Sequence, residues 1–153
     1  MRKNVFLISA AVAATFTFGA SAQVKADAAI EYRHSVFEVI GWNFKPMAAM
    51  VKGEAPYDKE AFAKRAANVA IMAPMALEGF APNTEKGDKE KTQAKPAIWE
   101  KMDDFKSKMS KLTEESTKLA AISKTGTLDE IKKQFGATGA ACKACHDDYK
   151  QKK

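Results

Sequence analysis

Both cysteines of this chain lie near its C-terminus, in the stretch Cys142-Lys143-Ala144-Cys145-His146. Cys-x-x-Cys-His is the attachment signature of a c-type haem, in which each sulfur bonds a porphyrin vinyl group and the histidine offers a nitrogen to the iron. On a helix, residues three and four apart share one face, so both anchors and the axial ligand would lie on the same side. The motif therefore predicts covalent haem.

Three other chemistries could use the same residues. A thiol–disulfide pair should lie at a helix N-terminus near a βαβ unit, whereas Cys142 and Cys145 come near the end of a helical pattern. A zinc site usually has four ligands, and only His34 could join these three residues. A structural disulfide is compatible with the two cysteines but gives His146 no role.

The first 22 residues are typical of a secretory signal peptide. Arg2 and Lys3 precede an apolar run, and Ala20-Ser21-Ala22 matches the small-x-small pattern of a cleavage site. The run is too short and too rich in Ala and Thr for a convincing membrane span. We therefore expect a signal peptide at 1–22, a domain at 23–153 without a membrane anchor, and a location in a periplasm, which is oxidising.

The composition is that of a single, mildly basic domain. The 153 residues include 25 Lys and Arg against 19 Asp and Glu, a formal net charge of +6. The charges are mixed along the chain, as on a solvated helix surface, and no basic patch with interleaved aromatic residues suggests nucleic acid. No group of carboxylates, nucleophile and base stands out beside the cysteine motif, so we do not expect an enzyme.

Apolar side chains that recur every three or four residues predict helices in the first half of the chain. One helix is expected over about 26–52, with Gly53 as its stop and Pro46 as a place where it could kink. A second is expected over about 58–78, with Asp58 as its N-cap.

The second half of the chain predicts two more helices. The connection 79–95 has no apolar period and is expected to be functional or mobile. A third helix should begin near Pro96 and stop near Gly126, and a fourth begins with a capping box of Thr127 and Glu130. Four helices and no strand pattern favour an all-α, antiparallel four-helix bundle with haem between the helices, because the cysteine motif lies in the apolar stripe of the last helix.

Several short stretches in this order resemble the cytochrome c′ family, and they cover essentially the whole of residues 23–153. They are Tyr32-Arg33-His34-Ser35, Met50-Val51-Lys52-Gly53, Ala55-Pro56-Tyr57-Asp58, Phe80-Ala81-Pro82-Asn83-Thr84-Glu85, Lys95-Pro96-Ala97-Ile98-Trp99 and the cysteine motif. The resemblance implies one covalent haem c per subunit, bound through Cys142 and Cys145 with His146 as proximal ligand. It also implies five-coordinate, high-spin ferric iron and a role in electron transfer or in binding nitric oxide and carbon monoxide. The alternative function is a periplasmic thiol–disulfide oxidoreductase that uses the two cysteines.

The resemblance extends to the opposite wall of the site. Arg33 is similar to an arginine that pairs with a haem propionate, and Phe37 to the apolar residue that closes the distal face. His34 is a rival distal ligand, while Glu85 and Asp88 lie in a loop that often approaches the haem edge.

Three further expectations concern ligands and partners. Met47 lies ten residues beyond Phe37, about 15 Å along a helix, too far to replace it as a ligand. Lys150 stands where the family often has arginine, so the resemblance does not imply proximal chemistry that depends on a guanidinium. The first helix commonly forms the subunit interface in the family, so a homodimer is expected. Its candidate contacts are Val39, Ile40 and Phe44. The redox partner is unknown.

Overall fold

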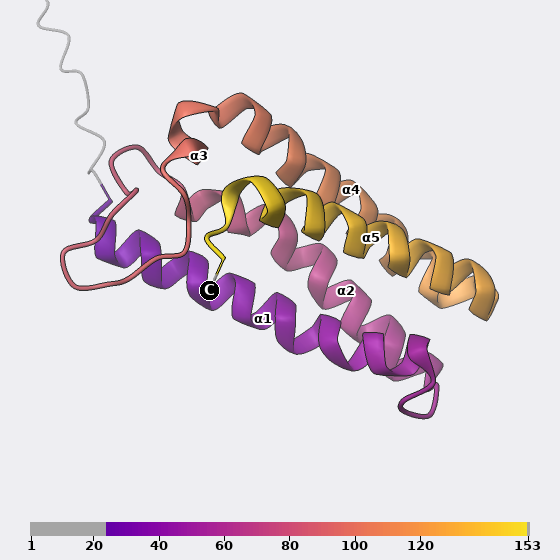
Figure 1. Cartoon of the computed structure of the whole chain (residues 1–153). Helices are drawn as coiled ribbons and strands as arrows, with labels where there is room; N and C mark the ends of the chain where they lie inside the picture. Colours follow the sequence, from indigo (N-terminus) through magenta and orange to yellow (C-terminus); the bar gives the residue numbers. More distant parts are fainter. Residues whose placement is uncertain (1–23, 153) are drawn as a thin grey trace, which may run out of the picture.

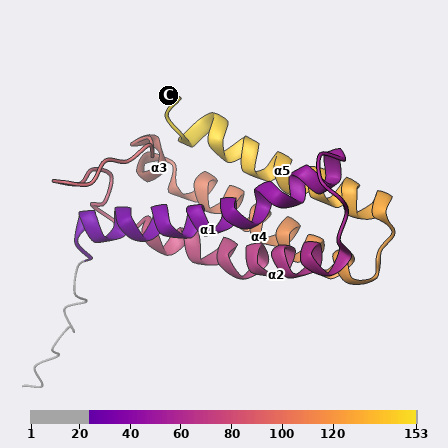
Figure 2. The same cartoon turned by 90° about the horizontal axis from the view of Figure 1, so that it is seen from below.

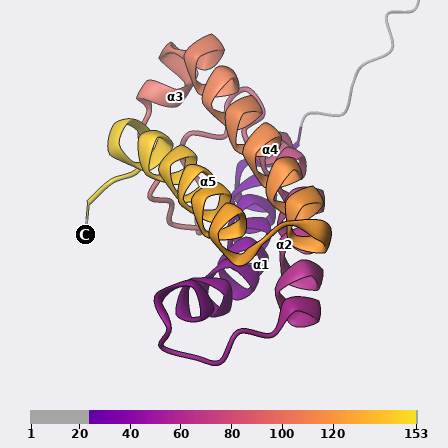
Figure 3. The same cartoon turned by 90° about the vertical axis from the view of Figure 1, so that its right-hand side faces the viewer.

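The computed structural model describes residues 24–152, which form an all-α bundle (Figure 1). Its elements are α1 (Ala26–Lys52), α2 (Lys59–Met75), the 3-10 helix η1 (Ala76–Gly79), α3 (Ala97–Glu100), α4 (Met102–Thr125) and α5 (Leu128–Tyr149). The four long helices run alternately in opposite directions, as the two turned views also show (Figures 2 and 3). The predicted antiparallel four-helix bundle is confirmed. The predicted signal peptide lies outside the described residues.

The helices pack in a chain of neighbours: α1 against α2, α2 against α4, and α4 against α5. Within residues 24–152, α1 and α5 are not among the closely packed pairs. They meet where the rings of Phe44 and Phe135 stack with centroids 4.3 Å apart. Phe135 lies in the first half of α5, so its second half, which carries the cysteine motif, is left with space opposite α1.

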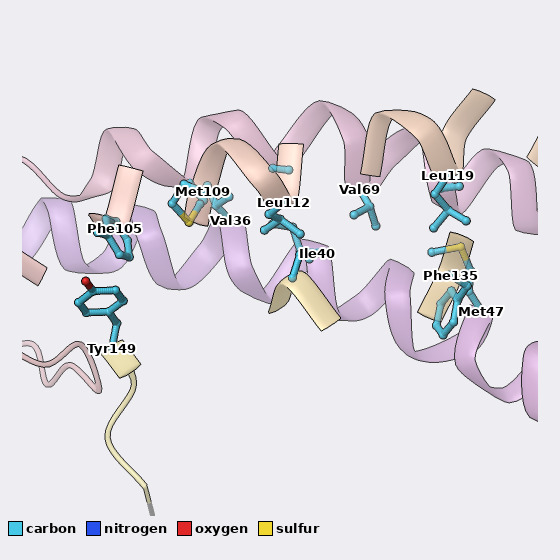
Figure 4. Packing of buried hydrophobic residues seen from close by; sticks show 14 of the residues in the cluster. Val36, Ile40, Met47, Val69, Phe105, Met109, Leu112, Leu119, Phe135 and Tyr149 are labelled. Carbon is cyan, nitrogen blue, oxygen red and sulfur yellow. The ribbon is translucent and has the colours of Figure 1, made fainter. Parts of the chain in front are cut away.

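The core runs along the whole bundle (Figure 4). Phe105 and Tyr149 lie at one end of the view, and Met47, Leu119 and Phe135 lie at the other. Met47 and Leu119 are fully buried. No helix among the described residues is both long and apolar enough to cross a membrane.

The helix ends follow the predicted local signals. Asp58 Oδ1 accepts a hydrogen bond from the Ala61 amide at 3.0 Å, as an N-cap does. Thr127 and Glu130 form the reciprocal capping box. Gly53 ends α1 with φ 77°, a left-handed conformation that glycine adopts without a steric penalty.

α1 continues through Pro46, and the backbone carbonyl that this proline cannot hydrogen-bond has another donor. Proline has no N–H, so the carbonyl of Trp42, four residues earlier, lacks its helical donor. Arg65 Nη1 of α2 donates to that oxygen at 3.4 Å. A side chain of the neighbouring helix thus partly replaces the missing bond.

Two of the predicted helices are not continuous α-helices. The second helix ends as an α-helix at Met75, just after Pro74, and continues as η1. The third is interrupted at Lys101, where φ is −126° and ψ is 45°. The short α3 is tied to the preceding connection, because Trp99 Nε1 donates to the Ala81 carbonyl at 2.9 Å. This long-range contact leaves no local signature that periodicity would detect.

One of the three predicted dimer contacts was wrong, because Ile40 belongs to the core and is only 7% exposed. Phe44 is half-buried in its stack on Phe135, and its place in an interface stays a prediction. Val39 is 42% exposed, and Trp42, which the sequence did not single out, is 75% exposed. The outward face of α1 is therefore the one that carries Val39 and Trp42.

Candidate haem site

A cavity of about 760 Å³ lies between α1, α4 and α5. That size is within the range of small-molecule and cofactor sites. Six of the eight predicted site residues are in its wall: Cys142, Cys145, His146, Arg33, His34 and Phe37. Glu85 and Asp88 are not in the wall. The cavity therefore joins the cysteine motif to the part of α1 that the resemblance identified, and it leaves out the two acidic residues of the loop.

The two cysteines lie three residues apart on α5 and carry free, half-buried thiols. Burial raises the pKa of the Cys142 thiol and raises that of Cys145 to about 11. A redox-active pair needs the opposite shift, because the thiolate is the nucleophile. The site thus lacks the electrostatics of a thiol–disulfide oxidoreductase, and both cysteines lie half-buried in the cavity wall.

His146 follows Cys145 directly and also reaches the cavity wall. Burial, helped by the charge of Lys150, lowers the pKa of its imidazole. The neutral imidazole is the form that binds a metal. Among residues 24–152 no three His, Cys, Asp or Glu side chains converge to hold a metal ion, which does not support the zinc interpretation.

Arg33 extends from α1 into the interior and is only 2% exposed. Its Nη1 donates to the carbonyls of Gly79 and Thr84, both at 3.0 Å, and its Nη2 donates to Thr92 Oγ1 at 3.0 Å. These partners span the long connection between α2 and α3. Arg33 therefore fixes the course of that connection beside the cavity.

The same guanidinium leaves one donor unused. Its carbon lies 5.0 Å from the centre of the Phe80 ring and 5.5 Å from that of Trp99. Burial lowers the pKa of Arg33, and the charge of Glu85 opposes that effect. Arg33 Nε is buried without a hydrogen-bond partner, although Arg33 is in the cavity wall. A buried charged donor without an acceptor is costly, so a carboxylate ligand in the cavity, such as a haem propionate, would fit this position.

Phe37 and His34 face the same cavity from α1. Phe37 is half-buried and packs edge-on against Phe80, with centroids 6.4 Å apart and ring planes at 68°. His34 is the other of the chain's two histidines, so both imidazoles of the protein reach one cavity. Met47 is fully buried and lies outside the wall.

Much of the remaining wall was not predicted. Apolar parts come from α1, α3, α4, the last residue of α5 and the residue after η1, and polar parts come from α1, the connection and the residue after α5. These additional residues are Ile40, Phe80, Ile98, Phe105, Met109, Leu112 and Tyr149, and Glu38, Lys45, Lys91, Thr92, Gln93, Ala94 and Lys150. Periodicity places Phe105, Met109 and Leu112 on an inward stripe but cannot tell a cavity wall from close-packed core.

Tyr149, which lies in the cavity wall at the end of α5, forms a hydrogen bond to α4. Its hydroxyl donates to Asp104 Oδ2, and that carboxylate raises the pKa of Tyr149 to about 12. Its ring packs edge-on against Phe105 at 5.4 Å. The last turn of α5 is therefore fixed to α4.

Comparison with known proteins gives consistent matches over nearly all described residues. A family model described as Cytochrome C' matches residues 28–150. The chain is 43% identical to cytochrome c' of Rubrivivax gelatinosus over 124 residues, which is 81% of this chain and 95% of that one. The structure of cytochrome c prime from Shewanella frigidimarina matches with a TM-score of 0.79 and 40% identity, covering 84% of this chain and 98% of that one.

A third match is a nitric oxide complex of a variant of cytochrome c prime from Alcaligenes xylosoxidans. Its TM-score is 0.77 and its identity 34%, over 86% of this chain and 99% of that one. Proteins of this family carry covalently attached haem c, and this chain has two cysteines to hold it. The chain belongs to the cytochrome c′ family of haem c proteins.

Proposed function

We propose that this protein is a periplasmic, high-spin cytochrome that transfers electrons and binds small diatomic gases. The observation that carries the proposal is the composition of the cavity wall, which has Cys142, Cys145 and His146 on one side and Phe37 on the other. The haem iron supplies the redox and gas-binding chemistry, and the bundle controls its axial ligand and access to it. The nitric oxide complex of the related protein is consistent with gas binding.

Each wall residue has a role that follows from its chemistry. Cys142 and Cys145 would form the thioethers, and the neutral imidazole of His146 would bind the iron as proximal ligand. Phe37 offers no atom that coordinates iron, so it would exclude water and larger ligands from the distal side. Arg33 Nε would donate to a propionate oxygen. Glu85 acts on Arg33 only through its charge, and we propose no contact of Glu85 or Asp88 with the haem.

A second candidate arrangement is favoured by one observation, the presence of His34 in the same wall as His146. Ligation by both imidazoles would give a low-spin cytochrome limited to electron transfer. In that case Phe37 would be part of the core near the site and would not control gas access.

The spectrum of the protein expressed with haem-maturation machinery tests these assignments. A Soret band that survives acid–acetone extraction is expected, and loss of either Cys142 or Cys145 by substitution with Ala should weaken covalent retention. The ferric spectrum should be high-spin at neutral pH and unchanged in the His34→Leu variant. A low-spin spectrum that becomes high-spin on His34→Leu would favour the second candidate, and a colourless protein with two reactive thiols would refute haem attachment.

We also propose export and self-association. Residues 1–22 would be removed as a signal peptide, leaving a domain that begins at residue 23. The exposed apolar side chains of Val39 and Trp42 on α1, with Ile71 at 64% exposure on α2, are consistent with a homodimer through α1.

The mass of the purified protein and its sedimentation test both points. We expect the mature N-terminus at Gln23 and a dimer that dissociates in the Trp42→Lys variant. Leu128→Lys, at an exposed apolar residue at the start of α5, is the matched control and should leave the dimer intact. A monomeric wild-type protein would contradict the proposed interface.

A further inference from the structure

The end of α5 is held by the connection that precedes α3. The last four carbonyls of an α-helix have no helical donor of their own unless the chain continues. In α5 these belong to residues 146–149, the turn that begins at His146. The His146 carbonyl accepts the Lys150 amide at 3.2 Å. The other three carbonyls therefore need donors from elsewhere.

One residue supplies all three donors. Lys95 Nζ donates to the Asp147 carbonyl at 3.2 Å and to the Asp148 carbonyl at 2.9 Å. The Lys95 amide donates to the Tyr149 carbonyl at 2.9 Å. A positive charge at a helix C-terminus is also favourable for the helix dipole. Lys95 is thus the cap of the helix that carries the motif.

The neighbours of Lys95 extend this attachment along the chain. Ala94 and Lys150 form an antiparallel bridge, and the Gln151 amide donates to the Gln93 carbonyl at 2.7 Å. We call residues 92–95 the strap. Its other end is fixed to α1, because Thr92 Oγ1 accepts a hydrogen bond from Arg33 Nη2 at 3.0 Å. The same oxygen also accepts a hydrogen bond from the Ala94 amide at 3.1 Å, within the strap.

The strap therefore connects α1 to the end of α5 at the place where the two helices do not pack closely. Thr92, Gln93 and Ala94 also line the cavity. The strap is consequently both a wall of the cavity and the link that sets the last turn of α5 relative to the α1 wall.

We infer that Lys95 is a positioning residue for His146, because it fixes the helical turn from which the imidazole reaches the cavity. The inference rests on the proposed role of His146 as axial ligand. Lys95 itself is not in the cavity wall, so it acts through the helix backbone and does not contact the cofactor. Loss of its ammonium group should let the last turn fray and make the imidazole position heterogeneous.

The test is the Lys95→Met variant of the haem-loaded protein, which keeps the aliphatic stem and removes the side-chain donors. We expect the iron–histidine stretching band of the ferrous protein to shift or broaden. We also expect hydrogen exchange at the Lys150 and Gln151 amides to rise roughly tenfold or more, since charge-assisted bonds are lost. Lys95→Arg, which keeps the charge and can reach carbonyls, should restore both measurements towards wild type.

Lys106→Met is the matched control, because Lys106 is exposed on α4 and takes part in no ion pair among the described residues. Should Lys95→Met fail to fold, Lys95→Gln, which has a shorter side chain without charge, provides the same comparison. A lower melting temperature with an unchanged iron–histidine band would overturn the inference, because it would show a purely structural role. A wild-type protein without such a band would refute the proposed ligand as well.

Discussion

The ring of Phe37 should control how fast carbon monoxide reaches the distal side of the site. The ring is half-buried, reaches the cavity from α1 and packs edge-on against Phe80. If His146 binds the iron as proposed, a ligand on the opposite side would have to displace this ring. Replacing Phe37 with Ala removes the obstacle and leaves the anchors on α5 untouched.

The expected magnitude follows from the contacts of that ring. An edge-on aromatic pair contributes about 0.5–1.5 kcal/mol beyond its buried area. Full burial of a phenylalanine contributes roughly 1.5–3 kcal/mol, of which about half applies to a half-buried ring. Displacement should therefore cost about 1–3 kcal/mol, and since a tenfold rate change corresponds to about 1.4 kcal/mol, association should accelerate roughly 5- to 150-fold in Phe37→Ala.

Flash photolysis of the ferrous carbon monoxide complex measures this rate directly. The matched control is Phe44→Ala, seven residues along the same helix, because Phe44 is half-buried against Phe135 but is not in the cavity wall. We expect its association rate to stay within twofold of wild type. A Phe37→Ala rate within twofold of wild type, or an equal acceleration in Phe44→Ala, would refute the assignment of Phe37 as the distal gate.

Three further predictions concern the scaffold. A Cβ on Gly79 would lie 2.6 Å from Arg33 Cβ, so Gly79→Ala should destabilise the fold by roughly 1–3 kcal/mol. A Cβ on Gly136 would meet no atom within 4 Å beyond its chain neighbours and the backbone of its own helix, so Gly136→Ala should stabilise the fold by about 0.5–1 kcal/mol. Urea titration measures both changes, and equal stabilities would contradict the packing argument. Hydrogen bonding, first of all to Lys111, lowers the pKa of Glu115 from 4.5 to about 2, so this carboxylate stabilises the fold above about pH 4.5 and loses its effect as the pH falls towards 2. Glu115→Gln should therefore flatten the fall in melting temperature between pH 5 and 3, and superimposable profiles would show that Glu115 is not responsible. Arg33→Met leaves several buried oxygen acceptors without donors and should cost at least about 2 kcal/mol in a denaturant titration, and an unchanged midpoint would refute its role as an anchor of the connection.

The features that could be predicted from the sequence are those whose causes are local. Asp58 caps α2 through an amide three residues away, and Thr127 and Glu130 cap each other within one turn. The apolar stripe that contains Cys142 and Cys145 keeps its three- and four-residue spacing along α5. Patterns of this kind need only neighbours in the chain, so periodicity and cap residues indicate them correctly.

The features that were missed depend on residues far apart in the chain. The face of α1 illustrates this, because Ile40 and Val39 are adjacent and similar in character, yet one is in the core and the other is exposed. Their assignment depends on how α1 packs against its neighbours in the bundle, which a single periodic stripe does not specify. The same reason explains why the strap was not predicted, since Lys95 finds its acceptors 52 and 53 residues later.

Arg33 shows why the scaffold and the site cannot be predicted separately. The resemblance alone assigns this arginine to a propionate, which would suggest a residue dedicated to the cofactor. In the structure Nη1 and Nη2 bind acceptors 46 to 59 residues away, and only Nε is left without a partner. The same side chain thus orders the connection that becomes the strap, and the strap in turn holds the turn of His146. A change at Arg33 should consequently reach the proximal side of the site through the backbone, even where the haem edge itself is unaffected.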